Sequence, residues 1–119
     1  MPVRVKICGL RTADTLAAAV DAGADMVGLV RYPKSPRHVD LDRAAALAAA
    51  VHGRAEVVVL TVDPTDDELA AIFAALQPDH LQLHGAETPE RTVAIGRAHN
   101  VKTIKALKVE TAADLAAAA

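Results

Sequence analysis

The chain alternates between strand-like and helix-like segments along its whole length, which restricts it to an α/β fold with a parallel sheet. The expected strands are Val3 to Ile7, Met26 to Val30, Glu56 to Val62, His80 to Leu83 and Lys102 to Ala106. The expected helices are Ala13 to Ala22, Leu41 to Val51, Asp66 to Leu76 and Pro89 to Ala98. Strands about 20 to 30 residues apart, each followed by a helix, are typical of right-handed βαβ units. We expect the sheet to curl in the order 1-2-3-4-5, with its helices outside.

The number of units indicates an incomplete barrel. A fifth helix is expected from Thr111, and it reaches Ala119 without a glycine or another terminating residue. Five strands do not close an eight-stranded barrel. We therefore expect the 119 residues to form a single domain that is the N-terminal portion of a longer protein.

Polar residues recur at every second position of two expected strands. One face of the first strand carries Arg4, Lys6 and Cys8, and the other carries Val3, Val5 and Ile7. The fourth strand repeats this pattern, with His80, Gln82 and His84 opposite Leu81 and Leu83. Because alternate side chains of a strand point to opposite faces, the apolar sets should meet the helices and the polar sets should point inward. Inward polar rows favour a barrel over a flat sheet that is covered on both faces.

The only cysteine, Cys8, lies where the first strand ends and turns toward a helix. Gly9 permits a sharp exit from the strand, and Thr12 is a suitable N-cap for the helix that follows. Parallel α/β folds gather their catalytic groups at such turns, because all strands deliver their carboxyl ends to one face.

The loop after the second strand holds three cations, Arg31, Lys34 and Arg37, and two prolines. A guanidinium group matches a carboxylate or a phosphate with two hydrogen bonds, so one interpretation is an anion clamp. The alternative interpretation is a solvated basic loop. Both stay open at this point.

Composition excludes several classes of partner. The formal net charge of −2 gives no electrostatic reason to expect binding to nucleic acid or to a membrane surface. A single cysteine cannot form an internal disulfide, and the N-terminus runs into a strand with no signal-peptide core. No apolar run approaches the ~20 residues that span a bilayer. We expect a cytoplasmic protein.

Four segments resemble the phosphoribosylanthranilate isomerase family of tryptophan biosynthesis, in that family's order and spacing. They are Lys6-Ile7-Cys8-Gly9-Leu10, Gly28-Leu29-Val30 leading to Ser35-Pro36-Arg37, Gln82-Leu83-His84-Gly85-Ala86-Glu87, and Ile104-Lys105-Ala106. The resemblance implies a (β/α)₈ barrel and an Amadori rearrangement of N-(5'-phosphoribosyl)anthranilate to a 1-deoxyribulose 5-phosphate product. It implies a small phosphosugar-anthranilate substrate and neither a metal nor an organic cofactor.

The same resemblance assigns roles to single residues. Cys8 matches the general base that removes the proton from C2' of the ring-opened imine, and positive charge from Lys6 or Arg37 would favour its thiolate. Arg37 matches a residue that binds the substrate carboxylate. His84 matches a pocket residue on the fourth strand. Gln82, one inward step below it, and Lys6 are further substrate-binding candidates. The family's general acid, an aspartate after the sixth strand, and its phosphate-binding loops have no counterpart in the chain, since neither Asp63 nor Asp114 lies in the required place.

Other interpretations compete with these roles. Cys8 could be an inert core thiol, and His80 and His84 could be hydrogen-bonded core residues. A zinc site built from Cys8, His80 and His84 is disfavoured, because the two histidines would lie about 13 Å apart along one strand. The chain could also be a non-catalytic half-barrel that forms a homodimer or binds a missing C-terminal half, or it could belong to another phosphosugar barrel enzyme. In Arg31 the chain departs from the aromatic or aliphatic residue of the family pattern.

Overall fold

The structure of the 119-residue chain is a computed structural model, and it describes residues 3–106. The strands are β1 (Lys6–Cys8), β2 (Met26–Val30), β3 (Glu56–Thr61), β4 (His80–Leu83) and β5 (Lys102–Lys105). The helices are α1 (Ala13–Asp21), α2 (Leu41–Val51), α3 (Asp66–Leu76) and α4 (Pro89–His99). These bounds lie within one residue of the predictions except at β1, and the helix predicted from Thr111 falls outside the described residues.

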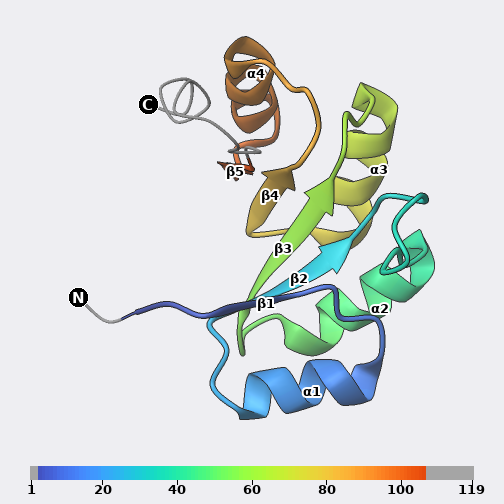
Figure 1. The fold of residues 1–119 in the computed structure, drawn as a ribbon, viewed down its shortest axis with the longest axis vertical. Coiled ribbons are helices and arrows are strands. Elements are labelled where there is room, and N and C mark those ends of the chain that lie inside the picture. Colours follow the sequence, from blue (N-terminus) through green and yellow to red (C-terminus); the bar gives the residue numbers. More distant parts are fainter. Residues whose placement is uncertain (1–2, 107–119) are drawn as a thin grey trace, which may run out of the picture.

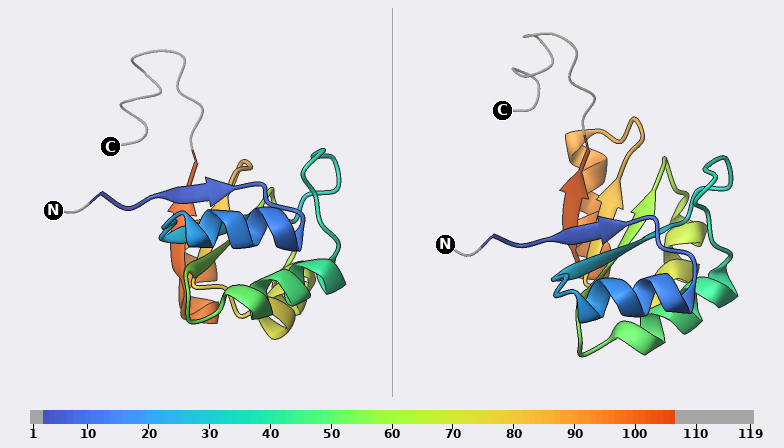
Figure 2. Two further views of the ribbon diagram at one scale, coloured as in Figure 1. Left: turned by 90° about the horizontal axis from the view of Figure 1, so that it is seen from below. Right: turned by 60° about the horizontal axis from the view of Figure 1, so that its bottom comes forward.

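The five strands form one parallel sheet in the order β1-β2-β3-β4-β5, which confirms the predicted topology. The sheet is strongly curled, and the four helices lie on its outer side (Figures 1 and 2). A side-chain contact shows the extent of the curl: Lys6 on β1 donates a hydrogen bond to Gln82 on β4. Strands three places apart in a flat sheet are about 14 Å from each other. Only a curled sheet allows these two side chains to meet.

The hydrophobic core lies between the outer face of the sheet and the helices. The strands contribute the fully buried side chains Val27, Leu29, Val57, Val59, Leu81 and Leu83. The helices contribute Leu16, Ala44, Leu47, Ala48, Leu69, Ile72 and Ile95. Alanines on the inner side of α2 keep that helix close to the sheet, because they add little bulk at the contact.

Each helix begins with a side chain that caps its backbone. Thr12, Asp40, Thr65 and Thr88 accept hydrogen bonds from the backbone N–H three residues later. At α3 the predicted capping box is complete, because Glu68 also accepts from the backbone N–H of Thr65. These caps fix where each loop at the carboxyl end of the sheet returns to a helix.

The first strand departs from the sequence prediction in one respect. It starts at Lys6 and includes Cys8, whereas the predicted strand covered Val3 to Ile7. The apolar side chains of this segment are not buried against helices, since Val3 is 86%, Val5 48% and Ile7 36% exposed. The physical reason is that α1 packs mainly against β2 and α2 rather than against β1.

Replacing Thr65 with alanine is expected to lower the free energy of unfolding of the complete protein by about 1 kcal/mol, because the amino end of α3 loses its cap. Urea denaturation measures this change. Thr92→Ala is the matched control: the Thr92 hydroxyl lies inside α4 and donates to the Thr88 carbonyl, which already accepts from the Thr92 backbone. Its loss should change the stability by less than about 0.5 kcal/mol. Equal losses in the two variants would contradict this account of the cap.

Candidate active site

The thiol of Cys8 occupies a space that a glycine on the neighbouring strand leaves open. Cys8 is half-buried at the carboxyl end of β1, and its partner in the sheet register is Gly28 of β2. A Cβ atom at position 28 would lie 2.8 Å from the Cys8 sulfur and 3.1 Å from its Cα. Any larger residue at position 28 would therefore displace the thiol. The inner position predicted for Cys8 depends on this glycine.

Arg37 lies directly over the turn that follows Cys8. A Cβ atom at Gly9 would come within 2.5 Å of Arg37 Cδ and 3.3 Å of its Nε and Nη1. Gly9 also has a φ of +82°, a conformation that side chains disfavour. The turn therefore requires glycine for its backbone shape and for the closeness of the guanidinium group. Arg37, on the loop after β2, therefore lies close to the end of β1, although the two are far apart in the sequence.

A chain of hydrogen bonds connects Lys6, Gln82 and His84 across the inner face. Lys6 Nζ donates to Gln82 Oε1, and Gln82 Nε2 lies 2.6 Å from His84 Nε2. Because lysine has only donors, it fixes the amide with its oxygen toward Lys6 and its NH₂ toward His84. Nε2 of His84 must then accept, which leaves the proton of a neutral ring on Nδ1.

His84 favours the neutral form for electrostatic reasons as well. Desolvation lowers its pKa below the ordinary histidine value, and the positive charges of Lys6 and Lys105 lower it further, against an opposing effect of Glu87. A neutral imidazole can accept from Gln82 and still offer one N–H donor. The side chain is exposed, so this donor is available to a ligand at the mouth of the barrel.

His80 belongs to a different layer, nearer the amino ends of the strands. Its Nε2 contacts a carboxylate oxygen of Glu56, whose other oxygen accepts from Arg4. The hydrogen bond from His80 lowers the pKa of Glu56 most strongly, and Arg4 adds to this. The interpretation of His80 as a hydrogen-bonded core residue agrees with its 8% exposure.

A buried ion pair that the sequence analysis did not single out joins the loops after β3 and β4 to the last residue of β5. Glu87 Oε1 lies 2.7 Å from Lys105 Nζ, and the Glu87 carboxylate also accepts from the backbone N–H groups of Asp63 and Gly85. Burial alone would raise the pKa of Glu87, but the hydrogen bonds from Lys105 and Asp63 hold it below its ordinary value. The only sequence signal was that each of these charged residues lies at or just after a strand end.

The three cations of the loop after β2 do not converge on one ligand. Arg31 turns inward, where its Nη1 donates to the carbonyl oxygen of Val39, whereas Lys34 and Arg37 are exposed. Of the two interpretations of this loop, an anion clamp could therefore not use all three cations, because Arg31 is already engaged within the loop. Arg37 is the cation that the structure places beside Cys8.

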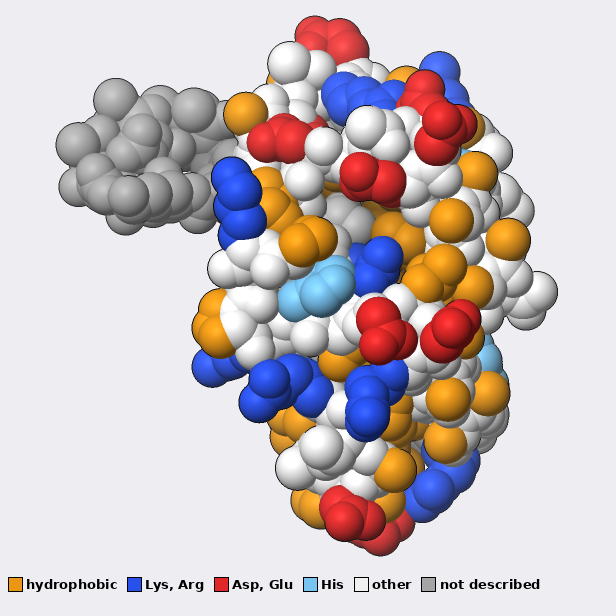
Figure 3. Space-filling model, turned by 90° about the vertical axis from the view of Figure 1, so that its right-hand side faces the viewer, with side chains coloured by type: hydrophobic (Ala, Val, Ile, Leu, Met, Phe, Trp, Pro, Cys, Tyr) orange, Lys and Arg blue, Asp and Glu red, His pale blue; other side chains and the backbone are white. Residues whose placement is uncertain are grey.

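These residues gather at the carboxyl ends of the strands. In Figure 1 the arrows of β2 and β3 point to the right-hand side, and Figure 3 views the molecule from there. A histidine lies at the surface near the middle of this face, and Lys and Arg side chains gather beside and below it. Cys8, Arg37 and the Lys6–Gln82–His84 chain supply a thiol, an exposed guanidinium and a neutral imidazole to this end of the barrel.

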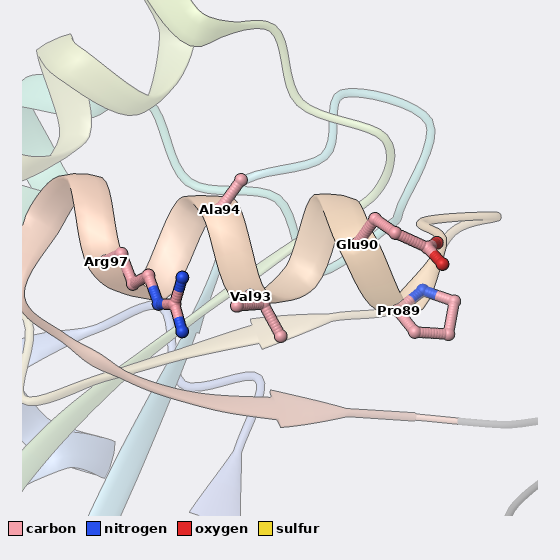
Figure 4. Close-up of a pocket in the computed structure, with 5 residues that line it drawn as sticks. All are labelled: Pro89, Glu90, Val93, Ala94 and Arg97. Carbon is pink, nitrogen blue, oxygen red and sulfur yellow. The ribbon is translucent and has the colours of Figure 1, made fainter.

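One surface groove lies away from these residues. It has a volume of about 450 Å³ and is lined by Pro89, Glu90, Val93, Ala94 and Arg97, all on the exposed side of α4 (Figure 4). None of the residues considered above lines it, so we assign it no part in the chemistry.

Within residues 3–106, no helix is long and apolar enough to cross a membrane. Over the same range, no group of three or more His, Cys, Asp or Glu side chains is arranged to hold a metal ion.

Comparisons with known proteins agree with one another. The family model for N-(5'phosphoribosyl)anthranilate (PRA) isomerase matches residues 5–119. N-(5'-phosphoribosyl)anthranilate isomerases of Azorhizobium caulinodans and Rhodopseudomonas palustris are 59% and 57% identical to the chain. Each match covers 98% of the chain but 51% and 54% of the relative. The chain thus spans about half the length of the curated relatives it matches.

Solved structures give the same result. The structure of phosphoribosyl anthranilate isomerase from Thermotoga maritima is 32% identical, with a TM-score of 0.91, over 98% of this chain and 56% of that one. A second structure of such an isomerase, in complex with reduced 1-(o-carboxyphenylamino)-1-deoxyribulose 5-phosphate, also has a TM-score of 0.91 at 32% identity, over 98% and 59%. The five strands and four helices are the corresponding part of a (β/α)₈ barrel, and the chain belongs to the N-(5'-phosphoribosyl)anthranilate isomerase family.

Proposed function

We propose that the complete protein is an aldose-ketose isomerase that converts N-(5'-phosphoribosyl)anthranilate to 1-(2-carboxyphenylamino)-1-deoxyribulose 5-phosphate in tryptophan biosynthesis. The observation that carries the proposal is the gathering of Cys8, Arg37 and the Lys6–Gln82–His84 chain at the carboxyl end of a barrel of this family. The proposal includes a cytoplasmic location and a reaction without metal or organic cofactor.

Cys8 acts as the general base in this proposal. Its thiolate removes the proton from C2' of the ring-opened, protonated imine. The released electron pair forms a C1'–C2' double bond, and the electron pair of the C1'=N bond returns to the nitrogen, which becomes a neutral amine. The resulting enol then becomes the C2' ketone by taking up a proton at C1' and releasing the proton of its C2' hydroxyl.

Arg37 and the residues of β4 bind and orient the substrate. The guanidinium group of Arg37 is exposed beside Cys8, where it can form two hydrogen bonds with the anthranilate carboxylate. His84 offers an N–H donor to the sugar, and Gln82 and Lys6 fix its tautomer from below. The general acid and the phosphate-binding loops have no candidate within residues 1–119, so the proposal concerns the complete protein.

The direct test is turnover by the purified complete protein. Phosphoribosylanthranilate is generated in the cuvette, and its loss is followed by fluorescence. Rapid loss with formation of the aminoketose supports the proposal. Absence of turnover by a folded, full-length protein would contradict it, and turnover of a different phosphosugar would support the alternative barrel enzyme.

Cys8→Ser is expected to lower kcat by about 10²-fold to 10⁴-fold, because an alcohol is a far weaker base than a thiolate at neutral pH. Steady-state kinetics and substrate-binding measurements on the complete protein separate loss of chemistry from loss of binding, and binding should be largely retained. Val93→Ser, a substitution on the exposed side of α4, is the control and should leave kcat unchanged. A nearly normal kcat for Cys8→Ser would eliminate Cys8 as the base.

Arg37→Ala is expected to raise KM more than it lowers kcat, because a contact with a non-reacting carboxylate contributes equally to the ground state and the transition state. Lys34→Ala removes an exposed positive charge from the same loop and should have little effect on KM. A collapse of kcat with unchanged KM would instead place Arg37 in the chemical step.

A second candidate, a self-associating half-barrel, is favoured by the exposed Val3, Val5 and Ile7 of the edge segment. A polypeptide limited to residues 1–119 is expected to associate and to lack isomerase activity, because β1 and β5 are unpaired edges of the described sheet. Light scattering and the fluorescence assay test both points. A monomer with substantial activity would contradict this expectation and the need for further residues.

A further inference from the structure

The loop that carries Arg37 is closed at its base by backbone hydrogen bonds. The N–H of Val39 donates to the carbonyl oxygen of Val30 at 3.0 Å, so the two ends of the loop lie side by side where β2 ends. Within the loop, Ser35 and His38 close two turns, and the N–H of Arg37 donates to Ser35 Oγ at 3.1 Å. The loop therefore has one defined shape, and Arg37 directly precedes the residues that close it.

The side chain of Arg31 forms a second connection between the two ends of the loop. Its Nη1 donates to the carbonyl oxygen of Val39 at 2.7 Å and lies 3.2 Å from Nε2 of His38. His38 and Val39 are the two residues that follow Arg37. One half-buried guanidinium group thus connects the start of the loop to the segment that immediately follows Arg37.

The contact with His38 requires a neutral ring that accepts a hydrogen bond. Burial lowers the pKa of His38, the charge of Arg31 lowers it further, and Asp40 opposes both. At neutral pH the Nε2 atom can therefore accept from Arg31. Both contacts of Arg31 are then attractive.

Stability alone does not account for this arrangement. Among the described residues, Nε of Arg31 and Nδ1 of His38 are buried side-chain atoms without a hydrogen-bond partner. Buried unsatisfied polar atoms cost free energy, and an apolar side chain of similar length would avoid that cost. The guanidinium group is better explained by the geometry that it imposes on the loop.

The position of the loop backbone matters most at Arg37, which directly precedes the closed base. The Arg37 side chain passes so close to Gly9 that a single added carbon atom would come within 2.5 Å of it. From the opposite flank, Arg11 donates to the carbonyl oxygen of Pro36 at 2.8 Å, which limits the movement of the loop on that side. A small displacement of the base would therefore move the guanidinium group of Arg37 away from the turn beside Cys8.

We propose that Arg31 is a positioning residue that holds the Arg37 loop, and with it the carboxylate-binding guanidinium group, over Gly9. The proposal rests on the isomerase function proposed above, since it needs Arg37 to bind substrate. Arg31 does not touch the substrate in this account and acts only through Arg37.

A double-mutant cycle on the complete protein tests this dependence. Arg31→Met should raise KM about tenfold, the factor that corresponds to one charge-assisted hydrogen bond, with kcat nearly unchanged. In the Arg37→Ala background the same substitution should change KM by less than about twofold, because residues that act as a unit are not additive. Arg54→Met is the control: this exposed arginine pairs with Asp21 on the surface and should leave KM unchanged. Fully additive effects of Arg31→Met and Arg37→Ala on KM would overturn the proposal.

Amide hydrogen exchange gives a readout that does not require turnover. In Arg31→Met the amide protons of His38 and Val39 should exchange faster, while those of α4 keep their protection. Unchanged exchange in the loop would overturn the proposal even if KM rises. If the unsubstituted protein does not isomerise the substrate, the proposed function fails, and exchange still decides whether Arg31 holds the loop.

Discussion

The contact between Lys6 and Gln82 crosses the concave side of the sheet, and the arrangement of the site depends on the curl that makes this contact possible. Curling brings the inner faces of β1 and β4 together, although β2 and β3 lie between them in the sheet. Polar side chains can then satisfy one another across the interior instead of being buried singly. The same curl sends the large apolar residues outward, where the helices cover them.

The inner face is divided into layers with different electrostatic properties. Near the amino ends, Glu56 is held between Arg4 and His80, so charge is matched within the layer. Toward the carboxyl ends, Lys6 donates to the neutral amide of Gln82, which in turn contacts the neutral ring of His84. Among residues 3–106, no acidic side chain forms an ion pair with Lys6. An anionic ligand at this end of the barrel would therefore experience its positive charge.

Much of this could be predicted from the sequence because the signals are local. Strand parity placed Lys6, Cys8 and Gln82 on the inner face. The Thr65–Glu68 spacing correctly predicted the first residue of α3. The exposure of Val5 and Ile7 was not predictable in this way, since it depends on where α1 packs. The Glu87–Lys105 pair and the inward turn of Arg31 join residues on separate elements, and neither spacing nor composition records which charged residue of a loop turns inward.

The proposed reacting and binding groups are held by different means, and the difference follows from their place in the fold. Cys8 lies in β1, and His84 directly follows β4, where its backbone N–H donates to the carbonyl oxygen of Thr61. The ladder of the sheet therefore fixes both residues. Arg37 has no such support, because it lies on a loop between β2 and α2. A guanidinium group on a loop can reach over the site, but its position must come from contacts other than the sheet ladder. Arg31 supplies one such contact within the loop, and Arg11, from the segment before α1, supplies another. A binding group that is carried by a loop instead of a strand thus depends on residues that need not touch the ligand.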